Sequence, residues 1–261
     1  MKFDSKKPSV SYYSVDVSWC LLDVTKPASL VACCATRQGS LIVQNYLKRF
    51  GNCSYILEQV SSSFCDMMKD PYANHVCQCL ITLCNESQRD FILNLIGHKV
   101  SQLARDAHGN YVLQCLIKNI TTKGQAIRFI SYLAKDVKNL IVDSYGNFVL
   151  QKTIEFWPAE LTQFIYHGVC EHILDVACDS HGCFVVKKCF EYGTYLQKSL
   201  VQSAIVANTL PLSQNFTGRI ILQYVLNVGE PLYFEAIKKQ LHGTRFEIFF
   251  KEPDYHIQKS H

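Results

Sequence analysis

Side chains that can bond the edge of a flat heterocycle recur along this chain at a fixed internal spacing. In three places asparagine is followed four residues later by glutamine: Asn74 and Gln78, Asn110 and Gln114, Asn147 and Gln151. A side-chain amide carries both donors and acceptors. On a helix, residues four apart lie about 40° from each other around the axis. Each pair is therefore expected to share one helix face and to bond the edge of one base.

A ring stands directly after each of these asparagines, at His75, Tyr111 and Phe148. Stacking of an unpaired base on such a ring contributes about 1–3 kcal/mol. Single strands expose both the edge and the face of a base, so amides and rings together favour single-stranded nucleic acid. The alternative is a row of ordinary solvated polar residues on a protein-binding surface. Three consecutive units with one pattern favour base reading.

The pattern belongs to a six-residue cadence: a small residue, a polar or small one, usually a bulky one, two apolar ones and a long polar one. It begins at six positions, 34 to 37 residues apart: Gly39, Ala73, Gly109, Gly146, Gly182 and Gly218. A period in this range indicates stacked structural units. No unit can bury its apolar face alone, and stacking the next unit against it does so. The predicted fold is all-α, a curved right-handed α-solenoid of about six three-helix units.

Within one unit, the residues from about 98 to 134 predict three helices: a short one over 98–104, a second over 110–120 and a third over 123–134. Asp106 and Gly109 are typical of the turn between the first two. We expect an irregular N-terminal segment or cap over residues 1–25, the repeat solenoid over 26–241, and a C-terminal tail or cap over 242–261.

Composition limits the remaining classes of function. The chain is 48% apolar and 18% charged, which is typical of a folded protein, and its net charge of +4 permits a nucleic-acid partner without arguing for one. Its thirteen cysteines include no C-x-x-C pair, and Cys77, Cys115 and Cys189 lie in apolar stretches. We therefore predict buried free thiols and no metal site. No secretory h-region and no membrane-spanning stretch is evident, so a reduced compartment, cytosol or nucleus, is expected.

Enzyme motifs are also missing from the sequence. It contains no G-x-x-x-x-G-K-[ST], G-x-S-x-G, G-x-G-x-x-G or H-E-x-x-H pattern. Asp106, Asp143 and Asp179 recur one period apart, which is typical of turn residues and not of a paired carboxylate site. We expect no catalytic activity and no cofactor.

The cadence closely resembles the Pumilio, or PUF, repeats over residues 30 to 241. The runs from Asn74 to Gln78 and from Asn110 to Gln114 are highly specific for that family. The stretch from Gly182 to Cys189 resembles its penultimate repeat, and the stretch from Gln223 to Pro231 its last. The resemblance implies triple-helix units forming a crescent, with single-stranded RNA bound antiparallel on the concave side. Two or three side chains would read one base per repeat.

In the family, asparagine with glutamine reads uracil, and serine or cysteine with glutamine reads adenine. The resemblance thus implies three uracil readers in the Asn/Gln pairs, an adenine reader in Ser40 with Gln44, and the target 5′-UUUA-3′. It also implies regulation of translation or decay through messenger 3′ untranslated regions, with effector proteins on the convex face. A monomer is expected, in the cytoplasm, with the nucleus or nucleolus as the alternative.

The chain departs from the family in its number of repeats and in its last two repeats. Members typically have eight repeats, and six are found here. Cys183 and Lys187 stand where the family places serine and glutamate to read guanine, and Arg219 with Ile220 matches no known combination. Weaker, less selective binding is expected at the RNA 5′ end. The alternative function is a degenerate solenoid that scaffolds proteins or holds ribosomal precursor RNA with little base preference.

The candidate RNA-binding residues are Ser40, Leu41, Gln44, Asn74, His75, Gln78, Asn110, Tyr111, Gln114, Asn147, Phe148, Gln151, Cys183, Phe184, Lys187, Arg219, Ile220 and Gln223.

Overall fold

Three helices of unequal length repeat six times along the chain. The computed structural model describes residues 27–229 and 231–246. The first helices are short: α2 (Pro27–Cys34), α5 (Phe64–Lys69), α8 (Val100–Ala104), α11 (Val137–Val142), α14 (Ile173–Cys178) and α17 (Thr209–Gln214). The second helices are α3 (Arg37–Phe50), α6 (Ala73–Leu83), α9 (Gly109–Asn119), α12 (Gly146–Phe156), α15 (Gly182–Tyr192) and α18 (Phe216–Val228). The third helices are α4 (Cys53–Val60), α7 (Glu86–Ile96), α10 (Lys123–Leu133), α13 (Ala159–Glu171), α16 (Tyr195–Ala207) and α19 (Pro231–Leu241). Short 3-10 turns at Ser61–Ser63, Gly97–Lys99 and Ala134–Asp136 precede α5, α8 and α11.

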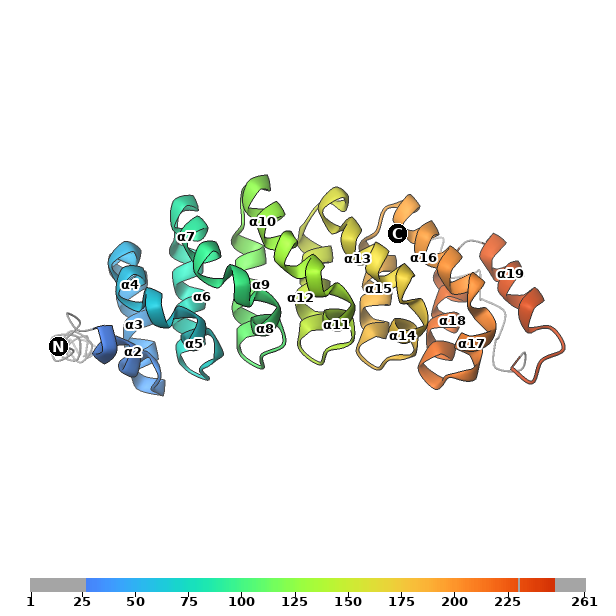
Figure 1. Ribbon diagram of the computed structural model, residues 1–261, viewed down its shortest axis with the longest axis horizontal. Coiled ribbons are helices and arrows are strands. Elements are labelled where there is room, and N and C mark those ends of the chain that lie inside the picture. The colour runs from blue at the N-terminus through green and yellow to red at the C-terminus, as the bar shows by residue number, and fades with distance from the viewer. Residues whose placement is uncertain (1–26, 230, 247–261) are drawn as a thin grey trace, which may run out of the picture.

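The units stack side by side in one row, from the N-terminal to the C-terminal end (Figure 1). Each second helix packs against the next, from α3 through to α18, and the third helices from α7 to α19 form a parallel row. Apolar side chains fill the space between the rows; Val112, Leu113 and Leu116 of α9 are fully buried. The predicted all-α solenoid is confirmed.

One side chain closes the turn between the first and second helix of each unit. Asp106 Oδ1 accepts hydrogen bonds from the backbone N–H groups of His108 and Gly109, at 2.9 and 2.8 Å. Asp70, Asp143 and Asp179 make the same pair of bonds in their own units. In the first and last units, Thr36 and Asn215 each accept one such bond. The recurrent aspartates are therefore turn residues, as the sequence predicts.

In every unit except the second, which has Ala73, a glycine in the first turn of the second helix meets a close approach of the preceding backbone. A Cβ on Gly182 would lie 2.5 Å from Val176 O, and one on Gly218 would lie 2.3 Å from Leu212 O. Both distances are shorter than van der Waals contact, so a side chain would not fit at either position. Without one, the second helix can begin directly against the end of the first.

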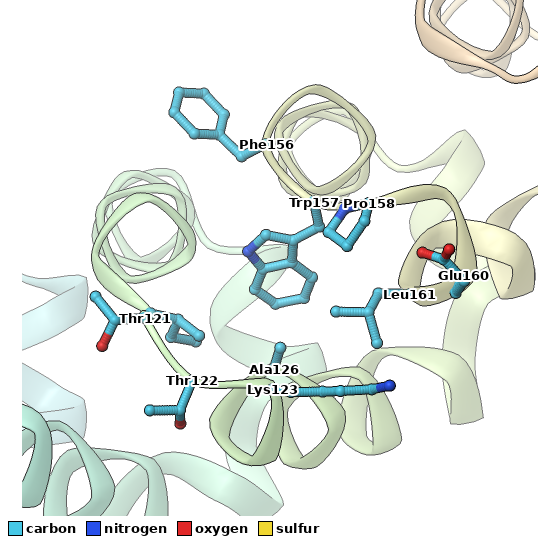
Figure 2. A pocket seen from close by; sticks show the side chains of 10 residues that line it. Thr121, Thr122, Lys123, Ala126, Phe156, Trp157, Pro158, Glu160 and Leu161 are labelled. Atoms are coloured by element: carbon cyan, nitrogen blue, oxygen red, sulfur yellow. The ribbon is translucent and has the colours of Figure 1, made fainter.

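Trp157 joins the third and fourth units. Its indole Nε1 donates to Ile117 O at 3.2 Å, and its ring meets Phe129 edge to face, with centroids 5.8 Å apart. Figure 2 shows the indole between the loop that ends α9 and the loop that ends α12, where it lines an open cavity of about 340 Å³. Trp157 therefore packs between repeats.

All twelve cysteines in the described part of the chain are free thiols. Burial raises the pKa of Cys34 and of Cys84 to about 12, so these thiols stay protonated and unreactive at neutral pH. Across residues 27–229 and 231–246, no three His, Cys, Asp or Glu side chains gather into a metal-binding group. In that same part of the chain, no helix is both long and apolar enough to cross a bilayer.

The segments predicted to cap the array lie mostly outside the described residues. Residues 1–25 fall there entirely, as do residues 247–261 of the predicted C-terminal tail. Residues 242–246 form turns after α19, and Phe246 among them is buried.

Replacing Asp143 by alanine removes the acceptor of two backbone N–H groups. The variant is expected to lose about 1–2 kcal/mol of unfolding free energy, as for loss of a helix cap. Asp143→Asn should lose less, because Asn215 makes a bond of this kind in the last unit. Thermal or urea unfolding measures the difference. The control is Asp66→Ala, which removes only an exposed pair with Lys69 and should cost less than about 0.5 kcal/mol. Equal stability of Asp143→Ala and Asp66→Ala would contradict this account of the turn.

Candidate nucleic-acid interface

The structure gathers all the candidate residues onto the row of second helices. In every unit the candidates occupy the same three positions of the second helix. Counted from the residue that follows the small residue of the cadence, these are the first, second and fifth positions. The first positions are Ser40, Asn74, Asn110, Asn147, Cys183 and Arg219. The second are Leu41, His75, Tyr111, Phe148, Phe184 and Ile220, and the fifth are Gln44, Gln78, Gln114, Gln151, Lys187 and Gln223. We call these three aligned positions on the second helices the reader row.

The second positions of the reader row are exposed in every unit. Tyr111, Phe148 and Phe184 keep 57%, 48% and 51% of their surface accessible, and Leu41, His75 and Ile220 are exposed as well. Large apolar side chains exposed at a regular interval, one per unit, are typical of a binding surface. The three rings can each stack on a flat partner.

The asparagines of the row are buried, which differs from the expectation that amide pair and ring share one exposed side. Asn74, Asn110 and Asn147 keep at most 2% of their surface accessible. Asn110 Nδ2 donates to Asp106 O at 2.9 Å and to Ala107 O at 3.0 Å. The physical reason is that these two carbonyls of the turn between the first and second helix accept hydrogen bonds, and the amide lies within reach to donate to both. The amide nitrogen of each asparagine is therefore directed into the turn and not presented at the surface.

Each buried asparagine instead orients the glutamine four residues later. Asn110 Oδ1 accepts from Gln114 Nε2 at 2.9 Å. The same bond joins Asn74 to Gln78 at 2.9 Å and Asn147 to Gln151 at 2.7 Å. The glutamines are only half-buried, and each keeps Oε1 and the second Nε2 hydrogen for a partner. The surface thus offers one acceptor and one donor per unit, in a fixed orientation.

The Watson–Crick edge of uracil matches the free acceptor and donor of the glutamine amide. Its N3–H is a donor and the adjacent O4 is an acceptor, so Oε1 and Nε2 of one glutamine can bond both. The exposed ring one position after the asparagine lies on the same helix face and can cover the base. One glutamine and one ring per unit are therefore sufficient to hold one unpaired base.

Ser40 performs the bracing role in the first unit. Its Oγ donates to Tyr72 O of the second unit at 2.8 Å and accepts from Gln44 Nε2 at 3.0 Å. The glutamine is thus oriented as in units two to four, although the brace is a hydroxyl and reaches across to the next unit.

The last two units form different bonds at these positions. Cys183 is buried and its thiol lies 3.4 Å from Ser180 O. Arg219 Nη1 donates to Ser213 O at 3.1 Å. Gln223 Nε2 donates forward to Asn227 at 3.2 Å. The departures expected from the sequence at these positions thus coincide with a different local hydrogen-bond pattern.

Two lysines lie next to the reader row, and sequence reasoning missed one of them, Lys152. Lys152 and Lys188 directly follow the fifth position in units four and five, and they pair with Glu155 and Glu191 at 2.6 and 2.8 Å. The hydrogen bond from Lys152 lowers the pKa of Glu155. Their ammonium groups lie 5.0 and 4.8 Å from the ring centres of Phe156 and Tyr192. The sequence signal for these pairs is the glutamate that stands three residues after each lysine.

A family model for the Pumilio-family RNA binding repeat matches residues 63–96, 99–127, 136–170 and 172–205. The chain belongs to the Pumilio family. The four matches correspond to units two to five, the units with an aspartate in the turn. Units one and six lie outside the matched ranges.

Named relatives agree with this assignment. A Pumilio domain-containing protein of Schizosaccharomyces pombe is 30% identical over 212 residues, covering 80% of this chain and 31% of the relative. Pumilio homolog 12 of Arabidopsis thaliana is 30% identical over 196 residues, covering 74% and 33%. The chain thus spans about a third of the length of these curated relatives.

Solved Pumilio structures share the fold. A Puf4 mutant bound to a Cox17 RNA 3′ UTR recognition sequence superposes with a TM-score of 0.77 at 25% identity, over 82% of this chain and 67% of that one. The Puf4 RNA binding domain bound to an HO endonuclease RNA 3′ UTR recognition sequence gives 0.76 at 24%, over 80% and 67%. The repeats of this chain are therefore of the RNA-binding PUF type.

Alanine substitutions of Asn110 and of Gln114, made separately, distinguish the role of the asparagine in the turn from the role of the glutamine at the surface. Asn110→Ala removes the side-chain donor to Ala107 O and one of the two donors to Asp106 O, which keeps the backbone N–H of residue 110. The variant is expected to lower the unfolding free energy by about 1–3 kcal/mol. Gln114→Ala, at a half-buried site, should cost less than about 1 kcal/mol. Urea unfolding of both variants provides the comparison. If Asn110→Ala were as stable as the unmodified protein, the asparagine would not brace the turn.

Proposed function

We propose that this Pumilio-family chain binds single-stranded RNA sequence-selectively, with one base per unit and the core target 5′-UUUA-3′. The observation that carries the proposal is the periodic pairing of an exposed ring with an oriented glutamine on adjacent second helices. Units two, three and four would each hold a uracil, and unit one the 3′ adenine. The uracil edge fits the free donor and acceptor of the glutamine, while the asparagine acts as a positioning residue behind it.

The assignment of adenine to unit one rests on the family pattern of serine with glutamine. An adenine offers N1 as acceptor and N6–H as donor, which a glutamine amide can also match. The difference from units two to four is then the brace, since Ser40 has one hydroxyl where they have an amide. Leu41 gives apolar contact in place of a ring, so we expect this base to be held less tightly.

We further propose that the whole protein acts on messenger 3′ untranslated regions and regulates their translation or decay. Support comes from the solved relatives, which are bound to recognition sequences of that kind. Effector proteins would dock on the convex face, opposite the reader row. In this proposal the protein acts as a monomer in the cytoplasm and has no catalytic step.

Removing one ring tests whether the exposed second positions stack on bases. Tyr111→Ala is expected to weaken binding of an oligonucleotide containing 5′-UUUA-3′ by roughly fivefold to 150-fold, from a loss of about 1–3 kcal/mol. Fluorescence anisotropy at fixed salt measures it. The matched control is Ile127→Ala, which removes a similarly exposed side chain from the third helix α10 and should leave affinity unchanged. Equal effects of the two substitutions would argue against stacking.

Removing one glutamine tests base reading itself. Gln114→Ala should relax the preference for uracil at the middle uracil of 5′-UUUA-3′, the base assigned to unit three, and leave the preferences at the other positions intact. The measurement is competition by oligonucleotides substituted at each position in turn. If no substitution changes affinity, and only salt and basic residues matter, the chain binds RNA without selectivity and the alternative function is favoured.

A further inference from the structure

Unit five replaces the reading amide with a cation. Lys187 occupies the fifth position, where units one to four have glutamine. Its ammonium lies 5.7 Å from the ring centre of Phe184 and 5.8 Å from that of Tyr224 in the next unit. Two rings therefore hold the ammonium by cation–π attraction.

The ammonium of Lys187 keeps its hydrogen-bond donors for a partner. Within the described part of the chain, it forms no ion pair and no hydrogen bond with protein. The nearest carboxylate on α15, Glu191, is bonded to Lys188 at 2.8 Å. The thiol of Cys183, one turn earlier, faces Ser180 O and offers nothing to a base. Reading at this unit depends on Lys187 alone.

An ammonium is a donor and never an acceptor, which sets the base edges it can bond. Uracil places its N3–H between O2 and O4, so an ammonium leaves that donor unpaired. Guanine presents N1–H and N2–H beside O6, and adenine presents N6–H beside N1. Cytosine alone places two acceptors, O2 and N3, side by side on the Watson–Crick edge.

We propose that unit five selects cytosine through Lys187, which extends the target to 5′-CUUUA-3′. The inference rests on the proposed function, because the register is taken from the uracil readers. α15 packs against α12 as α12 packs against α9, so Lys187 lies where Gln151 lies in the preceding unit. A strand that presents Watson–Crick edges to units two to four presents the same edge to unit five. The ring of Phe184, although it contacts the ammonium, is 51% exposed and so is accessible to a base as well.

The decisive experiment compares four RNAs that differ only at the first position of 5′-NUUUA-3′. The unmodified chain is expected to bind the cytosine RNA roughly fivefold to 150-fold more tightly than the uracil RNA, the discrimination of about 1–3 kcal/mol that a good pair of base contacts gives. Lys187→Gln should abolish the cytosine preference, and Lys187→Met should bind all four RNAs with nearly equal affinity. Because Lys187 is half-exposed, both variants are expected to fold, which thermal unfolding verifies.

Lys118→Gln is the matched control, since it removes an exposed lysine from another second helix outside the reader row. This substitution should weaken the binding of all four RNAs by the same factor. If Lys187→Gln did the same, Lys187 would be a phosphate contact and the inference would be overturned. Preference for guanine, lost with 7-deazaguanine, would also overturn it by showing Hoogsteen contact. Failure of the proposed function is distinguishable, because substitutions within 5′-UUUA-3′ would then have no effect either.

Discussion

The turn between the first and second helix of each unit is the constraint on which the rest of this structure depends. In units two to four, one aspartate carboxylate holds the backbone N–H groups that begin the second helix, and the following asparagine holds carbonyls of the same turn. The buried polar groups of the turn are thereby satisfied inside the unit. Because the asparagine also receives the glutamine amide, the hydrogen bonds that close the fold also orient the surface chemistry.

Repetition then converts one local arrangement into an extended surface. The apolar faces of the second helices pack on each other, which places one ring and one fifth-position side chain per unit on a continuous row. Where the turn chemistry is kept, in units two to four, the row is uniform. Where it changes, at Cys183 and Arg219, the exposed group changes with it: a lysine in unit five, and in unit six a glutamine bonded away from its own turn. Selectivity is therefore expected to vary along the row with the local bracing.

The sequence was sufficient for the period, the helices and the exposure of the rings, since apolar spacing and turn residues determine these directly. It was insufficient for the asparagines. The angle between Asn110 and Gln114 predicts a shared face, but the same asparagine also lies within reach of two carbonyls of the preceding turn, and those bonds bury it. Long-range bonds were also beyond sequence reasoning, as with Ser40, which contacts Tyr72 O, 32 residues away.

Side-chain amide hydrogen exchange followed by NMR tests the central claim most directly, with and without an oligonucleotide containing 5′-UUUA-3′. The account predicts that the Nδ2 hydrogens of Asn74, Asn110 and Asn147 are protected in both samples, while the Nε2 resonances of Gln78, Gln114 and Gln151 shift and gain protection only with RNA. Asparagine hydrogens that exchange freely without RNA, or glutamine resonances that RNA leaves unchanged, would contradict it.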